Sequence, residues 1–282
     1  MPFSLDTLTS RTVLHCSAAE QAQAMNRSFE QYLVPMRFDE ASFQRRFRGE
    51  NLDAEASRLW YCHDELVGVV YIARRGWTSR VAAMGLVVEA RGQRLGRPML
   101  QTAIDEARRR GDRLLILEVF ASNEPAIRLY QRLGFRSTRR LLGFQRPAAP
   151  AAPAADELTP ADPLVVARTV GREADEAQPW MLAGETLAAT TAPFVEAWTL
   201  QGQAYALLRP DAERVMLMSL VVPRTARRQG WGRRMVRALE ARYGQRLLLV
   251  HSLPEGSPAV ELMRHCGWQV SALDLWEMEC PL

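Results

Sequence analysis

Two short turns rich in glycine and arginine are the residues of this sequence best suited to chemistry. They are Arg91-Gly-Gln-Arg-Leu-Gly96 and Arg227-Arg-Gln-Gly-Trp-Gly232, and each lies between an apolar segment and a predicted helix. Backbone N–H groups at a helix start lack partners and the helix dipole adds partial positive charge, so such a turn binds phosphate or pyrophosphate. One turn alone is equally typical of an exposed loop. Two in equivalent positions favour an anion site in at least one of them.

The two turns are part of a longer internal repeat. Residues 84–135 resemble residues 218–268, with two additional residues before the second turn. The clearest other matches are Met84-Gly-Leu-Val-Val with Met218-Ser-Leu-Val-Val and Pro125-Ala-Ile-Arg-Leu-Tyr with Pro258-Ala-Val-Glu-Leu-Met. Self-similarity of this length indicates a tandem duplication of one domain.

Apolar spacing predicts the elements that position each turn. In the first copy one helix is expected between Pro98 and Gly111 and a shorter one between Pro125 and Gly134, and the second copy repeats both. Near the start, Ser17 and Asp39 are expected to cap two further helices, with Phe38 and Phe43 as a hydrophobic staple. The equivalent stretch of the second copy has only residues 172–189, which predicts that the second domain has a thinner wall on its acceptor side. The expected antiparallel strands are 59–62, 66–73 and 80–88, repeated as 196–200, 204–208 and 215–222.

A segment rich in proline and alanine marks the expected boundary between the copies. Residues 146–163 contain five prolines in eighteen positions, a composition typical of an extended spacer. The sequence therefore predicts an N-terminal domain over 1–146, a linker over 147–163 and a shorter C-terminal domain over 164–282. Each domain is expected to be α+β, with a mixed, mostly antiparallel sheet flanked by helices.

Composition narrows the class of protein. The chain has 282 residues, 48% hydrophobic and 24% charged, which is typical of globular proteins and allows about two domains. No apolar run is long enough to cross a membrane and the start lacks an export signal, so a cytoplasmic location is expected. The 36 basic residues are all arginine and are interleaved with acidic ones, which argues against nucleic-acid binding. The four cysteines lack zinc-ligand spacing, so no metal is expected.

These motifs resemble the GNAT superfamily of N-acetyltransferases, present twice. The family's pyrophosphate loop reads Gln/Arg-x-x-Gly-x-Gly/Ala, similar to both turns, and the resemblance covers about residues 10–145 and 164–280. It implies a sheet that splays between two strands, here 81–88 and 114–119, with the pantetheine arm of acetyl-CoA in the gap. It also implies direct attack by an amine, without a covalent enzyme intermediate. The family's later helix, Asn-x-x-Ala-x-x-x-Tyr-x-x-x-Gly-Phe, is matched by Asn123, Ala126, Tyr130, Gly134 and Phe135.

The resemblance assigns acetyl-CoA binding to the turns, to the strand ends before them and to Asn123. In the first copy the residues concerned are Leu86, Val87, Val88, Arg91, Gly92, Gln93, Arg94, Leu95, Gly96, Arg97 and Asn123. In the second copy they are Leu220, Val221, Val222, Arg227, Arg228, Gln229, Gly230, Trp231, Gly232 and Arg233.

The resemblance also implies catalytic roles. Tyr130 is the expected general acid that protonates the departing CoA thiolate; the alternative is that it only packs in its helix, as Met263 does in the second copy. Asn123 is either part of the site or a plain helix cap. Glu118 is the candidate general base, with a water relay as the alternative, and His251 stands at the equivalent place.

Both copies depart from the family pattern. The first has Arg94 where the loop has glycine, which would fail if a positive φ were needed there. The second has Ser257 or Gly256 near the asparagine position and Met263 in place of the tyrosine. The expected function is an acetyl-CoA-dependent N-acetyltransferase that acts on a primary amine of a small molecule or peptide, with its chemistry in the first domain. The alternative is a regulatory or scaffold protein that binds acetyl-CoA or CoA. Candidates for an acceptor pocket, or for the core, are Phe29, Tyr32, Trp60 and Trp77.

Overall fold

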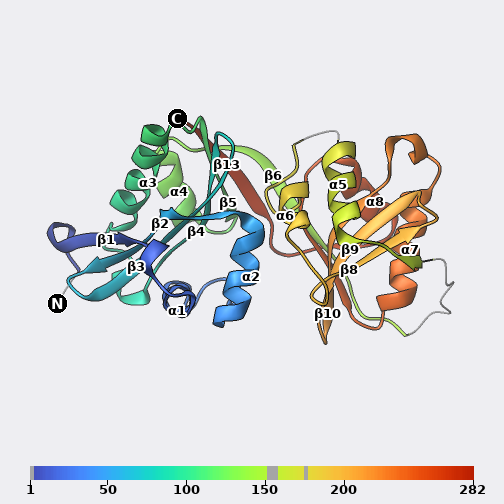
Figure 1. The fold of residues 1–282 in the computed structure, drawn as a ribbon, viewed down its shortest axis with the longest axis horizontal. Helices are drawn as coiled ribbons and strands as arrows, with labels where there is room; N and C mark the ends of the chain where they lie inside the picture. The colour runs from blue at the N-terminus through green and yellow to red at the C-terminus, as the bar shows by residue number, and fades with distance from the viewer. Residues whose placement is uncertain (1–2, 151–157, 175–176) are drawn as a thin grey trace. The chain divides into compact units, whose positions relative to one another are not determined.

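The computed structural model of the chain describes residues 3–150, 158–174 and 177–282 (Figure 1). Its contacts group into two compact units. The first unit runs up to Thr138 and also includes Glu277–Leu282, and the second unit is Arg139–Trp276. Each unit contains a mixed sheet with helices packed on it, which confirms the predicted α+β fold. No helix in the described ranges is long and apolar enough to cross a membrane.

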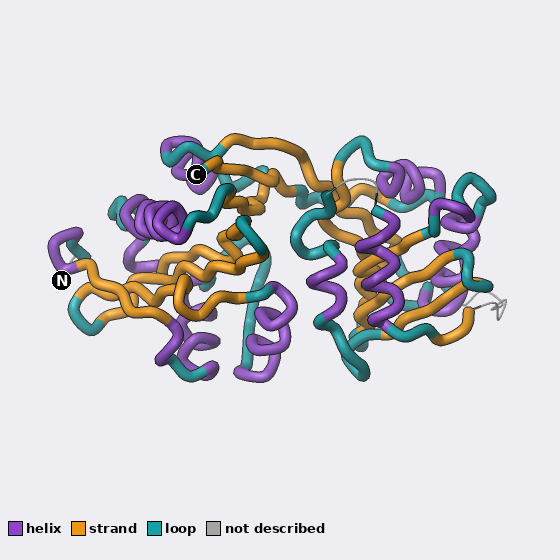
Figure 2. The backbone as a smooth tube through the Cα atoms, turned by 45° about the horizontal axis from the view of Figure 1, so that its top comes forward, coloured by secondary structure: helices purple, strands orange, loops and turns teal. Residues whose placement is uncertain are grey.

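The sheet of the first unit has the strand order β1-β2-β3-β4-β5-β13. Neighbours from β1 to β4 are antiparallel, whereas β4 and β5 are parallel. Helices α1 and α2 cover one face of this sheet and α3 covers the other (Figure 2). The elements are β1 (Leu8–Thr12), α1 (Ala18–Ser28), α2 (Glu40–Glu50), β2 (Leu52–Cys62), β3 (Glu65–Arg75), β4 (Thr78–Leu86), α3 (Gly96–Arg110), β5 (Leu114–Phe120), α4 (Glu124–Arg132) and β13 (Leu275–Pro281).

The second unit repeats this plan with the order β6-β11-β10-β9-β8-β7, and β12 also pairs with β6. Strands β10 and β11 are parallel and occupy the places of β4 and β5. The elements are β6 (Arg136–Arg146), β7 (Leu158–Pro160), α5 (Pro163–Glu173), α6 (Gly184–Ala188), β8 (Glu196–Leu200), β9 (Ala204–Pro210), β10 (Arg214–Val221), α7 (Trp231–Tyr243), β11 (Leu247–Pro254), α8 (Pro258–His265) and β12 (Gln269–Val270).

Local signals set the helix ends. Ser17 and Asp39 each form a complete capping box, and Phe38 packs edge-on against Phe43 with ring centroids 6.2 Å apart, as predicted. At the end of α3, Gly111 takes the left-handed conformation that stops the helix. The predicted strands also occur, most of them extended by a few residues. Residues 172–189 are expected to be all that the second copy has here, but α5 begins earlier, at Pro163, and α6 follows as a separate short helix. The second unit therefore also has two helices in this part of the chain.

Buried side chains form the core on both faces of the second sheet. One cluster joins Met235, Val236 and Leu239 of α7 to the sheet, and a second joins Val166 and Val170 of α5 to the opposite face. In the first unit, Tyr71 of β3 packs against two phenylalanines of α2 and donates its hydroxyl to the Gln21 carbonyl of α1 at 3.0 Å. The burial of Tyr71 therefore holds both helices on one face of the sheet.

Each unit completes its sheet with a strand that follows the other copy in the chain. β13, the last strand of the chain, lies beside β5 in the first unit, and its end is fixed where the Leu282 N–H donates to the Arg113 carbonyl at 3.1 Å. β6, which follows α4, pairs with β11 of the second unit, from Leu248↔Arg146 to Pro254↔Leu141. The two final strands are thus exchanged between the copies.

The observed division corrects the domain limits expected from the sequence. Contacts divide within β6, after Thr138, and again before Glu277, not at the predicted linker over 147–163. Within that linker, residues 151–157 lie outside the described residues, while Leu158–Pro160 is strand β7 and Pro163 begins α5. The physical reason is the strand exchange, because β6 and β13 each carry a chain segment across the expected boundary.

Replacing Met278 of β13 by alanine tests the exchange. Met278 is fully buried, so the cavity is expected to cost about 2–5 kcal/mol of unfolding free energy. That loss is expected to accelerate hydrogen exchange in β5 of the first unit, while Glu279→Ala serves as the control on the same strand. Faster exchange in β10 and β11 with β5 unchanged would contradict the assignment of β13 to the first unit.

Candidate functional site

Both sheets open at the position expected for the acetyl-CoA gap. Pairing of β4 with β5 runs from Thr78↔Leu114 to Val81↔Leu117 and ends there. In β4, Ala82 is an extra residue opposite β3, and such a bulge bends and twists its strand. In the second unit, the β10–β11 pairing ends at Met216↔Leu249, and β10 has a bulge at Met218.

The two turns after these strands share one backbone geometry. Each contains two residues with positive φ: Gly92 and Arg94 in the first, Arg228 and Gly230 in the second. Each copy thus uses one glycine and one arginine, at exchanged positions. A left-handed conformation costs a residue other than glycine about 1–2 kcal/mol. Each turn carries this cost at one position only. Arg94, with φ 62°, therefore adopts the conformation that its replacement of glycine had put in doubt.

The helices that follow the turns begin with exposed donors. Neither α3 nor α7 has a side-chain cap or an acidic residue in its first turn. The other long helices in the described ranges, α1, α2, α4, α5 and α8, all have a serine, aspartate or asparagine cap. A Cβ added at Gly92 or Gly230 would meet nothing within 4 Å, so an anion can approach the backbone. These features fit the pyrophosphate of acetyl-CoA.

Several predicted binding residues shape the turns with their side chains instead of facing a ligand. Arg91 donates from Nε to the Leu86 carbonyl at 3.1 Å and from Nη2 to the Glu30 carbonyl, and Arg227 bonds Val222 and Glu173 in the same way. Gln93 and Gln229 each donate to the carbonyl four residues earlier. The exposed arginines left for phosphate are Arg94, Arg97, Arg228 and Arg233.

Burial decides how the apolar residues predicted in the two sites could contact a ligand. Val87, Leu95 and Val221 are buried, so only their backbone groups could reach a ligand. Trp231 is half-buried, with the Arg234 guanidinium 4.2 Å from its ring centroid. Gly96 and Gly232 let α3 and α7 pack closely, because an added Cβ would lie 3.2–3.3 Å from a leucine of α4 or α8. Half-buried at the strand ends are Leu86, Val88, Leu220 and Val222.

Tyr130 lies in an aromatic group at the open end of the first sheet. Its ring centroid is 5.9 Å from that of Phe135, and it is close enough to Tyr32 for the two phenols to interact electrostatically. Burial raises the pKa of Tyr130 above its ordinary value, and Tyr32 adds to the rise. Tyr130 therefore stays protonated around neutral pH, as a general acid must.

Asn123 links the start of α4 to the same group. Its side chain accepts from the Ala126 N–H at 3.4 Å as a helix cap, and it also lowers the pKa of the Tyr32 hydroxyl, which burial raises more strongly. Tyr32 in turn packs on Phe29 and Phe120, with ring centroids 5.1 and 5.9 Å away. The structure thus brings two of the four aromatic pocket candidates, Phe29 and Tyr32, to this site.

The other two aromatic candidates lie elsewhere. Trp60 is buried in β2. Trp77 is 61% exposed at the opposite end of β4, beneath the Arg113 guanidinium at 3.4 Å from its ring centroid. Trp60 is therefore a core residue and Trp77 is part of a surface stack, so neither lines the pocket for which both were candidates.

Glu118 directly follows the last residue of β5 that pairs with β4, and its carboxylate forms an ion pair within a buried group of charged side chains. Its Oε2 lies 3.3 Å from Nη2 of Arg80, and Nη1 of Arg80 lies 2.6 Å from Oε2 of Glu50. Its other oxygen, Oε1, is buried without a hydrogen-bond partner. Burial raises the pKa of Glu118; Arg80 opposes the rise, while Glu277 and Glu50 add to it. A carboxylate with raised proton affinity is suited to act as a base.

Three charged residues of this network were missed by sequence reasoning. Arg80, Glu50 and Glu277 are all buried, and Arg80 and Glu277 stand beside or within apolar runs of the sequence. For these two, a charge inside an apolar pattern was the available signal, since ionised side chains are rarely buried unless paired. Glu50 lies between Gly49 and Asn51 and gave no such signal.

In the second unit, different side chains occupy the equivalent positions. Met263 is 2% exposed and packs in the core where Tyr130 lies in the first unit. His251 takes the place of Glu118 and is exposed, but partial loss of solvent around its ring, with Arg209 and Arg214, lowers its pKa. The second unit keeps the anion-binding geometry but not the phenol.

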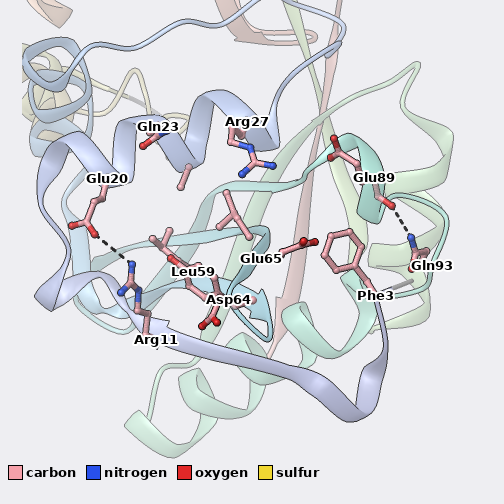
Figure 3. Close-up of a pocket in the computed structure, with 13 residues that line it drawn as sticks. Phe3, Arg11, Glu20, Gln23, Arg27, Leu59, Asp64, Glu65, Glu89 and Gln93 are labelled. Carbon is pink, nitrogen blue, oxygen red and sulfur yellow. Dashed lines mark hydrogen bonds and ion pairs between the residues drawn. The ribbon is translucent and has the colours of Figure 1, made fainter. Parts of the chain in front are cut away.

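A cavity of about 670 Å³ lies beside the first turn (Figure 3). Glu89 and Gln93 line it at one side, and Glu20, Gln23 and Arg27 of α1 line it at another. Neither Tyr130 nor Glu118 faces it, so this cavity is separate from the proton-transfer groups.

The pattern of both units matches one family. A family model described as the acetyltransferase (GNAT) family matches residues 21–135 and 174–268. The chain belongs to this family. The two matched segments confirm the tandem arrangement predicted from the repeat, and acetyl-CoA is the acetyl donor that GNAT enzymes use.

Relatives and solved structures agree with this assignment. The chain is 34% identical over 87 residues to an N-alpha-acetyltransferase 30 of Schizosaccharomyces pombe and 34% identical over 89 residues to a streptothricin acetyltransferase of Streptomyces lavendulae. These matches cover 29% and 31% of this chain, and 58% and 47% of the relatives. A tandem GNAT protein from the clavulanic acid biosynthesis pathway has the same fold, with a TM-score of 0.69 at 12% identity over 97% of this chain and 98% of that one.

Replacing Arg94 or Arg228 by alanine is expected to weaken CoA binding at the unit that carries the change by about tenfold or more, because a hydrogen bond to a charged group contributes about 1.5–3 kcal/mol. Calorimetric titration of CoA into the full chain measures this. Arg109→Ala, at the exposed far end of α3, is the matched control. An equal loss with Arg109→Ala would mean that overall charge, not the turn, attracts the ligand.

Proposed function

We propose that the first unit transfers the acetyl group of acetyl-CoA to a primary amine of a small molecule or peptide, by direct attack within a ternary complex. The proposal rests on three structural features that occur together in the first unit. Both units have an open sheet and an uncapped helix start, but only the first, as far as the described residues go, also has a buried phenol on the helix that follows its parallel strand pair: Tyr130 on α4, where α8 has Met263. The first two features bind the donor, and the third supplies a proton.

Each residue has a defined task in this reaction. The turn and the start of α3 hold the pyrophosphate, and the arginines on its surface add charge-assisted bonds. Glu118, directly or through a water, takes a proton from the acceptor amine as its nitrogen forms the new C–N bond. The C–S bond then breaks, and Tyr130 gives its proton to the leaving thiolate. Asn123 and Tyr32 orient the start of α4 and hence Tyr130.

The relatives support an amine acceptor. One is named an N-alpha-acetyltransferase and the other a streptothricin acetyltransferase, so an alpha-amino group and a small molecule are both represented. The buried carboxylates around Glu118 also favour an acceptor that arrives as a cation, because their charge is complementary to an ammonium group.

A second role, binding of acetyl-CoA or CoA without turnover, is favoured for the second unit. The start of α7 is uncapped like that of α3, yet Met263 cannot donate a proton. Such a unit would act as a scaffold or sensor for the first.

Replacing Tyr130 by phenylalanine keeps the ring and removes the proton, so kcat is expected to fall by roughly 10²-fold while folding survives. Met263→Leu is the matched control in the second copy and is expected to change little. Thiol release with a panel of amines, amino acids and peptides provides the assay. Full activity of Tyr130→Phe, together with loss in Arg228→Ala, would move catalysis to the second unit.

The pH dependence tests Glu118. A base must be deprotonated, so kcat/KM is expected to fall as the pH drops through the raised pKa of Glu118, and this acid limb should lie above the range of an ordinary glutamate. Glu118→Gln is expected to lower the rate by roughly 10²-fold and to remove the limb. If the limb persisted unchanged in Glu118→Gln, a different group would be the base.

A further inference from the structure

The C-terminal strand brings a buried carboxylate to the first unit. Glu277 lies in β13, the strand beside β5, and belongs with its neighbours to the first unit by its contacts. Only 4% of Glu277 is exposed, and the adjoining Met278 is fully buried. A buried carboxylate thus lies on the strand next to the one that carries Glu118.

The charges around Glu118 come from three other elements. Arg80 of β4 bridges Glu50 of α2 and Glu118 of β5, and Glu50 also holds Arg46 of α2, with Nε 2.9 Å from Oε1. Glu277 of β13 acts on Glu118 electrostatically. Glu118 therefore shares one guanidinium with Glu50 and is exposed to the negative charge of both other carboxylates. These interactions are strong because the surroundings are buried and screened little by solvent.

The second unit shows what the exchanged strand does at the equivalent place. There β6 lies beside β11, and an added Cβ at Gly143 would come within 3.2 Å of His251 Nδ1. His251 is the counterpart of Glu118. Leu141-Leu-Gly143 of β6 matches Leu275-Trp-Glu277 of β13, since each triplet stands at the same distance before Pro147 or Pro281. The exchanged strand therefore adjoins the place of the candidate base in the second unit, and it has a glycine there where the first unit has Glu277.

We propose that Glu277 is a positioning residue of the first unit's acceptor site, which controls the protonation of Glu118 from the C-terminal strand. This proposal rests on the proposed role of Glu118 as base. According to this proposal, the last strand of the chain supplies a strand of the first unit's sheet and also the charged group that acts on Glu118. A negative charge beside a carboxyl favours the protonated form, so Glu277 strengthens Glu118 as a base for an amine.

The test compares pH profiles of kcat/KM for the full chain and three variants. Glu277→Gln keeps the shape and removes the charge, so the acid limb is expected to move to lower pH by about 1 unit. Glu277→Asp keeps the charge but withdraws it by one methylene, so a smaller shift in the same direction is expected. Glu279→Gln, two residues along the same strand, is the matched control and is expected to leave the limb in place. Thermal unfolding of each variant checks that it folds.

The outcomes separate this inference from the proposed function. If Glu118→Gln is inactive and both Glu277 variants keep the wild-type limb, the role of Glu277 is refuted and that of Glu118 stands. If Glu118→Gln keeps the wild-type rate and limb, the base assignment fails and the inference fails with it. If Glu277→Gln does not fold, the Glu277→Asp profile decides, since an unshifted limb there overturns the proposal.

Discussion

The end of hydrogen bonding between β4 and β5 is the constraint on which the rest of the first unit depends. Past Val81 and Leu117 the two strands no longer pair, and the Ala82 bulge bends β4 away. β4 then leads into the turn whose positive φ residues direct the start of α3. β5 continues past Glu118 to the aromatic group near Tyr130. One break in a sheet thus places the turn with its uncapped helix start at the end of β4, and Glu118 and the aromatic group around Tyr130 at the end of β5.

The exchange of final strands makes this arrangement depend on both ends of the chain. β5 has β13 as its neighbour, so the first unit is complete only when the last residues are present. Pairing of strands so far apart in sequence has a loop-closure cost in entropy, and such non-local contacts slow folding. A fragment ending at the Pro/Ala segment would lack β13, and a fragment starting there would lack β6. Separated halves are therefore poor substitutes for the whole chain.

Local patterns predicted most elements and the family, but not the partners of the strands. Ser17, Asp39 and Gly111 act within one turn of chain, so their caps could be predicted from neighbouring residues. The apolar alternation of β13 predicts a strand and says nothing of which edge it joins, because register is set by tertiary packing. The bridge from Glu50 through Arg80 to Glu118 spans three separate elements, and for that reason Glu118 could be proposed as a base while the charges that raise its pKa could not.

The two units share their backbone arrangement and differ in single side chains. Both keep the strand break, the pair of positive φ residues, the uncapped helix and the arginine bonded to backbone carbonyls. These are backbone features that tolerate exchange of glycine and arginine, as Arg94 and Arg228 demonstrate. The proposed proton donor is one side chain, Tyr130, and Met263 fills the equivalent place in the core of the second unit. The turn depends on several backbone groups whereas the proposed general acid depends on one side chain, so a duplicated unit can keep the first arrangement without the second.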